Sequence, residues 1–226
     1  MKKLILNIIW LIRVIPKHIK KYSKKTDNNK ISLLARFIFY IIFSNKNILS
    51  HSKVKIYGIK NIEINGLLEI GVYTNEFLHP KDKTLLNIQG KLRFAGSYSI
   101  GRGSRIFVAK EGVIEIGKGG HITAFTNFII RHKLVIGDNC AISWNCQFLD
   151  DDRQSIDYIG RKEKAKEIII GNHVWIGSGV QMYQGTVIPD GCVVASNSVV
   201  RGIFDKENSI IGGVPARIIK ENISWK

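Results

Sequence analysis

The sequence has few cysteines and no apolar run long enough to cross a membrane. Its three cysteines, Cys140, Cys146 and Cys192, make an odd number in 226 residues and give no disulfide framework. The first apolar run, residues 4–12, lacks the small-residue cleavage site of a signal peptide. Neither this run nor the second, residues 31–43, reaches the roughly 18–20 residues that a spanning helix needs. These absences favour a reducing, cytoplasmic location.

Acidic residues are almost missing from the N-terminal quarter. Residues 1–60 hold fourteen Lys or Arg and one acid, Asp27, whereas the other 166 residues are close to balanced. The basic residues flank the two apolar runs, a pattern typical of amphipathic helices lying on an anionic membrane surface. We therefore expect residues 1–50 to form a helical, basic segment that contacts the inner face of the cell membrane peripherally. The alternative is that these helices pack on the rest of the protein or on a neighbouring subunit. No recognition motif accompanies the charge, so we expect no nucleic acid as partner.

A six-residue repeat occupies most of the remaining chain. Large apolar residues recur six apart in four runs, which are Phe94, Ile100, Ile106; Ile116, Ile122, Phe128; Ile136, Ile142, Phe148; and Ile170, Ile176, Met182, Ile188, Val194, Val200. A period of six fits no helix, but it fits short parallel strands that each end in a turn. Residues 60–93 keep the pattern less strictly and are expected to form irregular opening coils.

Two further positions follow the same period. Glycine often succeeds the large residue, as at Gly101, Gly117 and Gly177, where a corner requires either positive φ or close backbone approach. A small residue comes four positions after the large one, and all three cysteines occupy this position. Alternate residues of a strand share a face, so we expect the cysteines to be small core residues and neither nucleophiles nor metal ligands.

The sequence lacks the metal-binding histidines and the phosphate loop that two other enzyme classes would need. His18, His51 and His79 lie outside the repeat, and the other three histidines show no metal-ligand spacing, so no metal site is expected. No glycine-rich phosphate loop precedes the repeat, which excludes a nucleotidyltransferase of the usual kind.

The repeat resembles that of the hexapeptide-repeat acyltransferases, and the stretches 142–156, 171–177 and 212–225 resemble those of bacterial cell-surface polysaccharide O-acetyltransferases. The resemblance implies an all-β fold: a left-handed parallel β-helix with three hexads per coil, preceded by the basic segment. We expect this domain to span residues 51–226, with a loop at 149–169, where the repeat fails, and a C-terminal cap at 201–226. The resemblance also implies acetyl-CoA as donor, a glycan hydroxyl as acceptor and a homotrimer with its sites between neighbouring helices.

The loop departs from the family at its most important position. Relatives carry Asp-x-Asp-x-His there, and the histidine accepts the proton of the attacking hydroxyl. Here Gln154 replaces that histidine, and an amide has no useful basicity. Another group then serves as base, with His132, His173 and Asp152 as candidates. His132 falls in an inward position of the repeat, and His173 in a turn between strands, so buried structural roles are the alternatives.

Three other interpretations of Gln154 stay open. The acceptor is an amine, which needs no strong base; or the chain is a catalytically silent trimer that binds glycan or coenzyme A as a scaffold; or the glutamine is an engineered substitution. We take an acetyl-CoA-dependent acetyltransferase of a cell-envelope polysaccharide as the main hypothesis, with O-acetylation ahead of N-acetylation. Its acceptor is a glycan, lipid-linked or free, and the silent trimer is the alternative.

The expected site residues fall into three groups. The catalytic group is Gln154, Asp152 and His132, and the acceptor-binding group is Trp144, Asn145 and Asp150. The donor-binding group is Trp175, Gly177, Ser178, Ser196, Asn197, Pro215, Arg217 and Lys220. Corner amides suit the pantetheine arm or a thioester oxyanion, and Arg217 and Lys220 suit phosphates. The structural alternative for residues 215–217 is the start of a capping helix.

Overall fold

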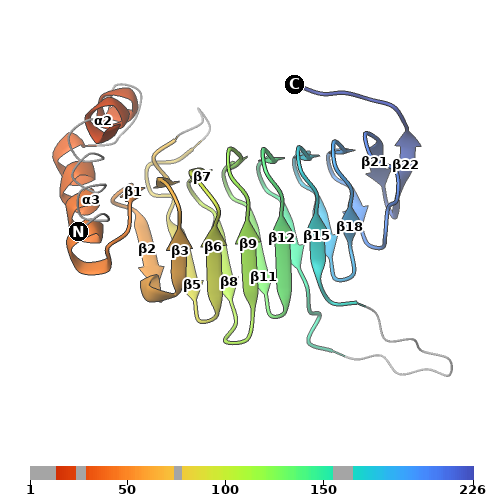
Figure 1. The fold of residues 1–226 in the computed structure, drawn as a ribbon, viewed down its shortest axis with the longest axis horizontal. Helices are drawn as coiled ribbons and strands as arrows, with labels where there is room; N and C mark the ends of the chain where they lie inside the picture. Colours follow the sequence, from red (N-terminus) through yellow and green to blue (C-terminus); the bar gives the residue numbers. More distant parts are fainter. Residues whose placement is uncertain (1–13, 24–28, 74–77, 155–164) are drawn as a thin grey trace.

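The computed structural model describes residues 14–23, 29–73, 78–154 and 165–226. Two helices, α2 (Ile15–Ser23) and α3 (Lys30–Ser44), precede a stack of coils that ends in a hairpin (Figure 1). After these helices, the described residues form short strands and one turn of 3-10 helix, η2 (Ile59–Asn61). The part of the N-terminal segment at residues 1–13 lies outside the described residues.

The strands form three parallel sheets, which we call faces A, B and C. Face A holds β1 (Ile48–Ser50), β4 (Leu68–Ile70), β7 (Tyr98–Ile100), β10 (His121–Ile122), β13 (Ala141–Ile142), β16 (Trp175–Ile176), β19 (Val193–Val194), β21 (Ile210–Gly213) and β22 (Ala216–Lys220). Face B holds β2 (Val54–Tyr57), β5 (Thr84–Ile88), β8 (Arg105–Val108), β11 (Asn127–Ile130), β14 (Gln147–Leu149), β17 (Gln181–Tyr183) and β20 (Val199–Val200). Face C holds β3 (Ile62–Ile64), β6 (Lys91–Phe94), β9 (Val113–Ile116), β12 (Lys133–Ile136), β15 (Ile168–Ile170) and β18 (Val187–Ile188).

From β1 to β20 each strand pairs in parallel with the third strand along the chain, so one coil contains one strand of each face. The register confirms the hexads, because Ile122 pairs with Ile142 and Ile142 with Ile176. All the large hexad residues from Phe94 to Val200 are buried in one continuous core. The predicted parallel β-helix is therefore confirmed. Among the strands that the structure describes, the exception to parallel pairing is the antiparallel hairpin β21–β22, which closes face A.

The cysteines lie inside the coils, as predicted. Cys140, Cys146 and Cys192 are at most 1% exposed and belong to the main core. The Cys146 thiol donates to the carbonyl of Gly177 at 3.1 Å, so its polar hydrogen is satisfied within the interior. Burial raises the pKa of Cys140 and of Cys146 to about 11, which keeps both thiols protonated near neutral pH. A nucleophilic role for them is thus excluded.

Close backbone approach explains the glycine that follows the large hexad residue. A Cβ on Gly171 would lie 2.8 Å from the amide nitrogen of Asp190, and one on Gly177 would lie 2.7 Å from the amide nitrogen of Ser196. Positive φ occurs two residues later in each corner, for example at Gly179 and at His173. The corner therefore needs one residue without a side chain and a second that tolerates the left-handed region.

The structure bears out one expectation at the start of the repeat and corrects another at its end. Residues 60–93 form the irregular opening coils that the sequence predicted, because they supply β3 to β6 with a long insertion at 71–83 between β4 and β5, and the first coil already begins at Ile48. The alternative of a capping helix at 215–217 is wrong, because Ala216–Lys220 is a strand paired with β21. At this end, pairing with the neighbouring strand outweighs a poor local sequence pattern.

The two helices pack on the first coils through a second core. Leu33 and Phe37 of α3 and Ile15 of α2 are buried together with Leu49 and Leu67 of the coils. Arg36, in the middle of the apolar run, donates to Ser50 Oγ, Tyr40 Oη and the carbonyl of Val54, each at 2.9 Å. The expected alternative, that the N-terminal helices pack on the protein, is therefore true of one side of α3.

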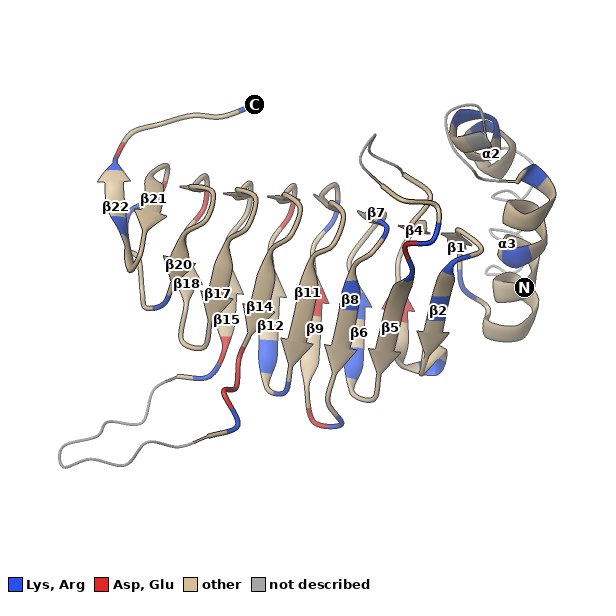
Figure 2. Cartoon of the chain, turned by 180° about the vertical axis from the view of Figure 1, so that it is seen from behind, with Lys and Arg blue, Asp and Glu red and all other residues tan. Residues whose placement is uncertain are grey.

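The other side of α3 is apolar and exposed. Ile31, Phe39, Ile42 and Phe43 are between 52% and 78% exposed. Figure 2 shows basic residues on α2 and α3 at this end of the molecule. Among the described residues no helix combines the length and the apolar character that crossing a bilayer requires.

Candidate functional site

The loop predicted to carry chemistry leaves the coil where face B passes into face C. The first acid after β14, Asp150, is fully buried, and its carboxylate accepts the backbone amides of Arg131 and His132, both at 2.8 Å. Burial raises the pKa of Asp150, and the two amides oppose that shift. Asp150 therefore stabilises the turn at Arg131 and His132 in the preceding coil. Its burial argues against the direct contact with a sugar that the sequence suggested.

The His132 side chain lies at the base of this loop and is about one third exposed. Its Nε2 is 3.4 Å from Oδ2 of Asp151, which is long for a hydrogen bond but close enough for electrostatic attraction. The inward position predicted for His132 is wrong. The reason is that β11 keeps its alternation through Ile130, whose buried side chain takes the inward place, so residues 131 and 132 form the turn.

Asp151 was missed as a site residue by the sequence argument. Its Oδ1 accepts the backbone amide of Arg153 at 2.7 Å. That amide, followed by His132, lowers the pKa of Asp151, and partial desolvation opposes the change. The carboxylate is therefore ionised beside the imidazole at neutral pH, which suits it to orient and stabilise a protonated histidine.

Asp152 and Gln154 occupy different surroundings. Asp152 Oδ2 accepts Nε2 of Gln184 and Nη2 of Arg201, each at 3.1 Å, so this carboxylate is held by the next coils. Its pairing with a guanidinium favours a positioning role over proton acceptance. Gln154 is exposed and directly precedes the undescribed residues 155–164. Figure 2 shows acidic and basic residues together where this loop leaves the coils.

The predicted acceptor residues Trp144 and Asn145 lie at another corner, where face A passes into face B. Trp144 is 47% exposed. Asn145 has a φ of 59° and shares a column of left-handed corner residues with Gly179 and Asn197. Asparagine tolerates this conformation better than most residues, so the corner geometry by itself accounts for Asn145 and Asn197.

Only some of the predicted corner amides are free to bind a ligand. The amide of Gly177 donates to the carbonyl of Val194, and that of Asn197 donates to the carbonyl of Ser178, both at 2.8 Å. The amides of Ser178 and Ser196 make no hydrogen bond to any described residue, and the two hydroxyls are 3.3 Å apart. The expected donor contacts of Gly177 and Asn197 through their amides are therefore wrong, because the coil stack uses them.

Trp175 lies on the outer side of face A. Near it lies Trp225, which the sequence argument did not consider. The indole of Trp175 donates to Ser143 Oγ at 3.1 Å. The C-terminal tail runs back over the coils (Figure 1) and stacks Trp225 on His173, with ring centroids 4.1 Å apart and planes 5° apart. Trp225 also donates to the carbonyl of His173 at 3.0 Å. His173 thus has a structural partner, and this contact favours its structural alternative over a role as base.

The predicted phosphate-binding residues lie on the closing hairpin. Pro215 is exposed at the turn between β21 and β22, and Arg217 and Lys220 are exposed on β22. Arg217 Nη1 donates to the carbonyl of Ala216 at 2.8 Å, which leaves the rest of its guanidinium available. These three side chains are accessible to a ligand from solvent.

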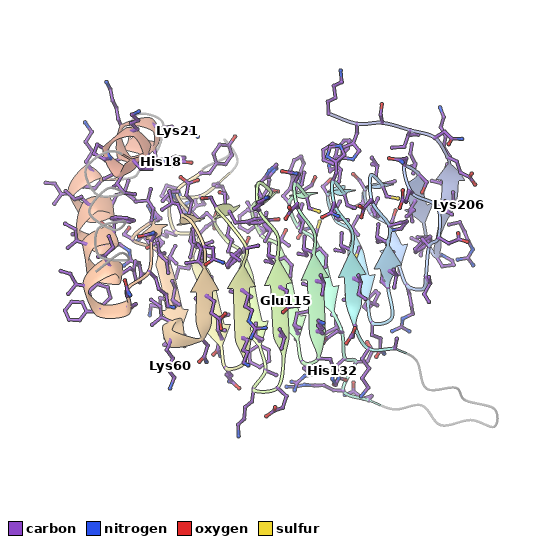
Figure 3. The ribbon with its side chains drawn as sticks, in the orientation of Figure 1. His18, Lys21, Lys60, Glu115, His132 and Lys206 are labelled. Carbon is purple, nitrogen blue, oxygen red and sulfur yellow. The ribbon has the colours of Figure 1, made fainter. Side chains whose placement is uncertain are left out.

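The structure therefore divides the predicted site into two groups. The loop group (His132, Asp151, Asp152 and Gln154) lies at the corner between faces B and C. The face A group (Trp144, Trp175, Ser178 and Ser196) lies on face A and at its corner with face B. The strands of face B separate the two groups within one chain. Figure 3 shows His132 at the opposite edge of the coils from His18 and Lys21 of α2.

Comparisons with known proteins agree with this architecture. Residues 167–202 match the family described as bacterial transferase hexapeptide (six repeats). The chain is 36% identical over 210 residues to a 24.8 kDa protein in the cps region of Klebsiella pneumoniae, covering 92% of this chain and 94% of that one. It is 29% identical over 143 residues to the Escherichia coli K12 protein WbbJ, named as an O-acetyl transferase of lipopolysaccharide biosynthesis, covering 58% of this chain and 72% of WbbJ.

A solved structure extends the comparison to the fold. The crystal structure of the polySia-specific acetyltransferase NeuO superimposes with a TM-score of 0.50 at 22% identity, covering 80% of this chain and 76% of that one. The left-handed form of the parallel β-helix, which the resemblance implied, is thereby confirmed. The sequence matches a relative over most of its length, and its coils superimpose on those of a solved acetyltransferase. The protein therefore belongs to the hexapeptide-repeat family of left-handed β-helix acyltransferases.

Proposed function

We propose that the protein transfers an acetyl group from acetyl-CoA to a hydroxyl group of a cell-envelope polysaccharide. The observation that carries this proposal is the match to WbbJ, which spans 58% of this chain and 72% of that protein's length. The relatives' names supply the acceptor class. The exposed cations of the closing hairpin suit the phosphates of a coenzyme A donor.

His132 is the proposed base of this reaction. It is the one imidazole in the described part of the loop group, and histidine is the most common general base in enzymes. Asp151 lies on the Nε2 side of the imidazole, so Nδ1 would accept the proton of the attacking hydroxyl and pass it to the coenzyme A thiolate that leaves when the thioester C–S bond breaks. Gln154, with two donors and an acceptor on its amide, would position that hydroxyl. Asp152, held by Gln184 and Arg201, would fix the path of the loop.

The face A group is proposed to bind the donor. The free amides of Ser178 and Ser196 would stabilise the negative charge that develops on the thioester oxygen. Trp175 would lie along the pantetheine arm, and Pro215, Arg217 and Lys220 would contact the nucleotide end. Because the loop group lies at another corner, a complete site needs the loop of a second copy beside face A. This geometry supports the homotrimer with sites between subunits.

The test of the reaction supplies purified full-length protein with acetyl-CoA and a purified envelope polysaccharide. Mass spectrometry of the product identifies the transferred acyl group. Mild alkali then releases acetyl from an ester and leaves an amide intact, which separates O-acetylation from N-acetylation. Coenzyme A binding without any transfer would instead favour the silent scaffold.

Membrane contact through residues 1–50 is a separate part of the proposal, with residues 51–226 as the catalytic domain. The exposed apolar side of α3 and the lysines of α2 suit an anionic cytoplasmic leaflet, which would bring the site close to a lipid-linked glycan. Full-length protein is expected to sediment with vesicles of phosphatidylcholine and phosphatidylglycerol, and less so at high salt.

The triple variant Phe39→Ser, Ile42→Ser, Phe43→Ser is expected to weaken vesicle binding by more than about tenfold. Burying one such side chain contributes about 1.5–3 kcal/mol, and a factor of ten corresponds to about 1.4 kcal/mol. The control is Ile203→Ser, which removes a still more exposed apolar side chain (78%) from the opposite end of the coils. Equal binding by the triple variant and the control would contradict the membrane role of α3.

A further inference from the structure

A groove that no sequence motif indicated runs between α2 and face A. It has a volume of about 520 Å³ and is lined by Lys21 and Tyr22 of α2, by Tyr73, and by Glu69, Ser99, His121, Thr123 and Trp144 of the coils. That volume lies within the usual range for small-molecule sites. A smaller hollow of about 280 Å³ shares Glu69 and Ser99 with it and continues along α2. The groove is thus an extended feature of face A.

Helix α2 is fixed over the groove by one carboxylate. Glu69 of β4 binds Nδ1 of His18 at 2.6 Å and accepts the hydroxyl of Tyr22 at 2.9 Å. Figure 3 shows His18 and Lys21 together on α2 at this edge of the coils. Glu69 is therefore paired with His18 and Tyr22 of the helix. Lys21, the other charged residue that lines the groove, does not pair with Glu69.

The lining combines aromatic faces with hydrogen-bonding groups. Trp144 is 47% exposed and Tyr73 is 51% exposed, so both present ring surface to solvent. The His121 ring makes no hydrogen bond to any residue that the structure describes. Desolvation by the surrounding walls lowers the pKa of His121, so its imidazole is neutral at pH 7 and offers one donor and one acceptor. Aromatic faces with paired donors and acceptors suit a sugar, which has apolar ring faces and a rim of hydroxyls.

The groove lies on the same face as the residues proposed to bind the donor. His121 pairs with Ala141, and Ala141 pairs with Trp175, so the three occupy one row of outward positions. Two strand spacings of about 4.8 Å place His121 about 10 Å from Trp175 along that row. The carbonyl of Trp144 accepts the amide of Gly179, which adjoins Ser178. A ligand in the groove would therefore end beside the proposed thioester position.

We propose that the groove between α2 and face A binds the glycan acceptor, with Trp144 and Tyr73 against sugar rings and His121 in contact with a hydroxyl group. This inference rests on the proposed function for the identity of the ligand as acceptor. It adds a binding site on face A to the loop group, and it gives α2 a second role as one wall of the acceptor site.

The experiment compares His121→Ala and Trp144→Ala with the native full-length protein and with Tyr57→Ala, which removes an exposed aromatic residue of face B (56%). The probes are defined oligosaccharides of neutral hexoses, of N-acetylhexosamines and of acidic sugars. Tryptophan fluorescence and calorimetry report binding, and steady-state kinetics with acetyl-CoA report KM and kcat separately. Circular dichroism checks that each variant is folded.

Loss of one stacking or hydrogen-bonding contact is expected to raise KM for the oligosaccharide about tenfold in each groove variant. KM for acetyl-CoA and the behaviour of Tyr57→Ala should stay unchanged. Unchanged oligosaccharide affinity in both folded groove variants would overturn the inference while leaving the proposed function intact. Groove-dependent binding in a protein that transfers no acetyl would support the groove as a glycan site and overturn the proposed function.

Discussion

His132→Ala is expected to lower kcat for acetyl transfer about 10²- to 10⁴-fold, the usual contribution of a positioned general base. The reason is the missing histidine at position 154, which leaves His132 as the imidazole of the loop group. Its Nε2 lies 3.4 Å from Asp151, and Asp150 holds its backbone amide at 2.8 Å. KM for acetyl-CoA should change little, because the proposed donor contacts lie on face A.

Two variants separate catalysis from structure in this experiment. Asp151→Asn keeps the shape of the side chain and removes its charge, so it is expected to lower kcat by about tenfold while His132 remains. The control His79→Ala removes an exposed histidine outside the coils' repeat and should retain native rates. A folded His132→Ala protein with native kcat would show that the base is elsewhere.

The second large effect is expected on stability. Phe148→Ala should lower the free energy of unfolding by about 3–5 kcal/mol, as for other buried aromatic residues. Phe148 is fully buried and stacks on Phe128 of the coil below, with centroids 4.6 Å apart and planes 6° apart. The two rings lie just before the corners that carry Asp150 and His132. Their loss should therefore loosen the base of the loop as well.

Denaturant unfolding of the full-length protein measures this change. Phe148→Leu, which keeps most of the apolar volume, is the matched control and is expected to cost less than about 1.5 kcal/mol. Unfolding of Phe148→Ala within about 1 kcal/mol of the native protein would contradict the view that this stack supports the coils.

The coils could be predicted from sequence because their period is repeated many times. Between Phe94 and Val200 the large residues return every six positions in four runs, and the small residue four positions later includes all three cysteines. Each hexad makes the same structural unit, so errors at single positions do not disturb the pattern. The register of Ile142 on Ile176 follows from that repetition.

The site residues were harder to predict because their places depend on contacts between distant parts of the chain. The outward turn of His132 follows from the extra length of β11, which the hexad count did not show. Trp225 lies 52 residues from its partner His173 in the sequence. The groove beside His121 exists only because Glu69 holds α2 over face A. None of these relations leaves a local sequence pattern.

The most direct test of the central claim is the rate at which the native full-length protein transfers acetyl from acetyl-CoA to an envelope polysaccharide, measured beside Gln154→His and His132→Ala. We expect transfer by the native protein, no dependence on a histidine at position 154, and loss of transfer in His132→Ala. Binding of coenzyme A by the native protein, with turnover only in Gln154→His, would contradict the claim. The chain would then be a catalytically inactive member of the transferase family.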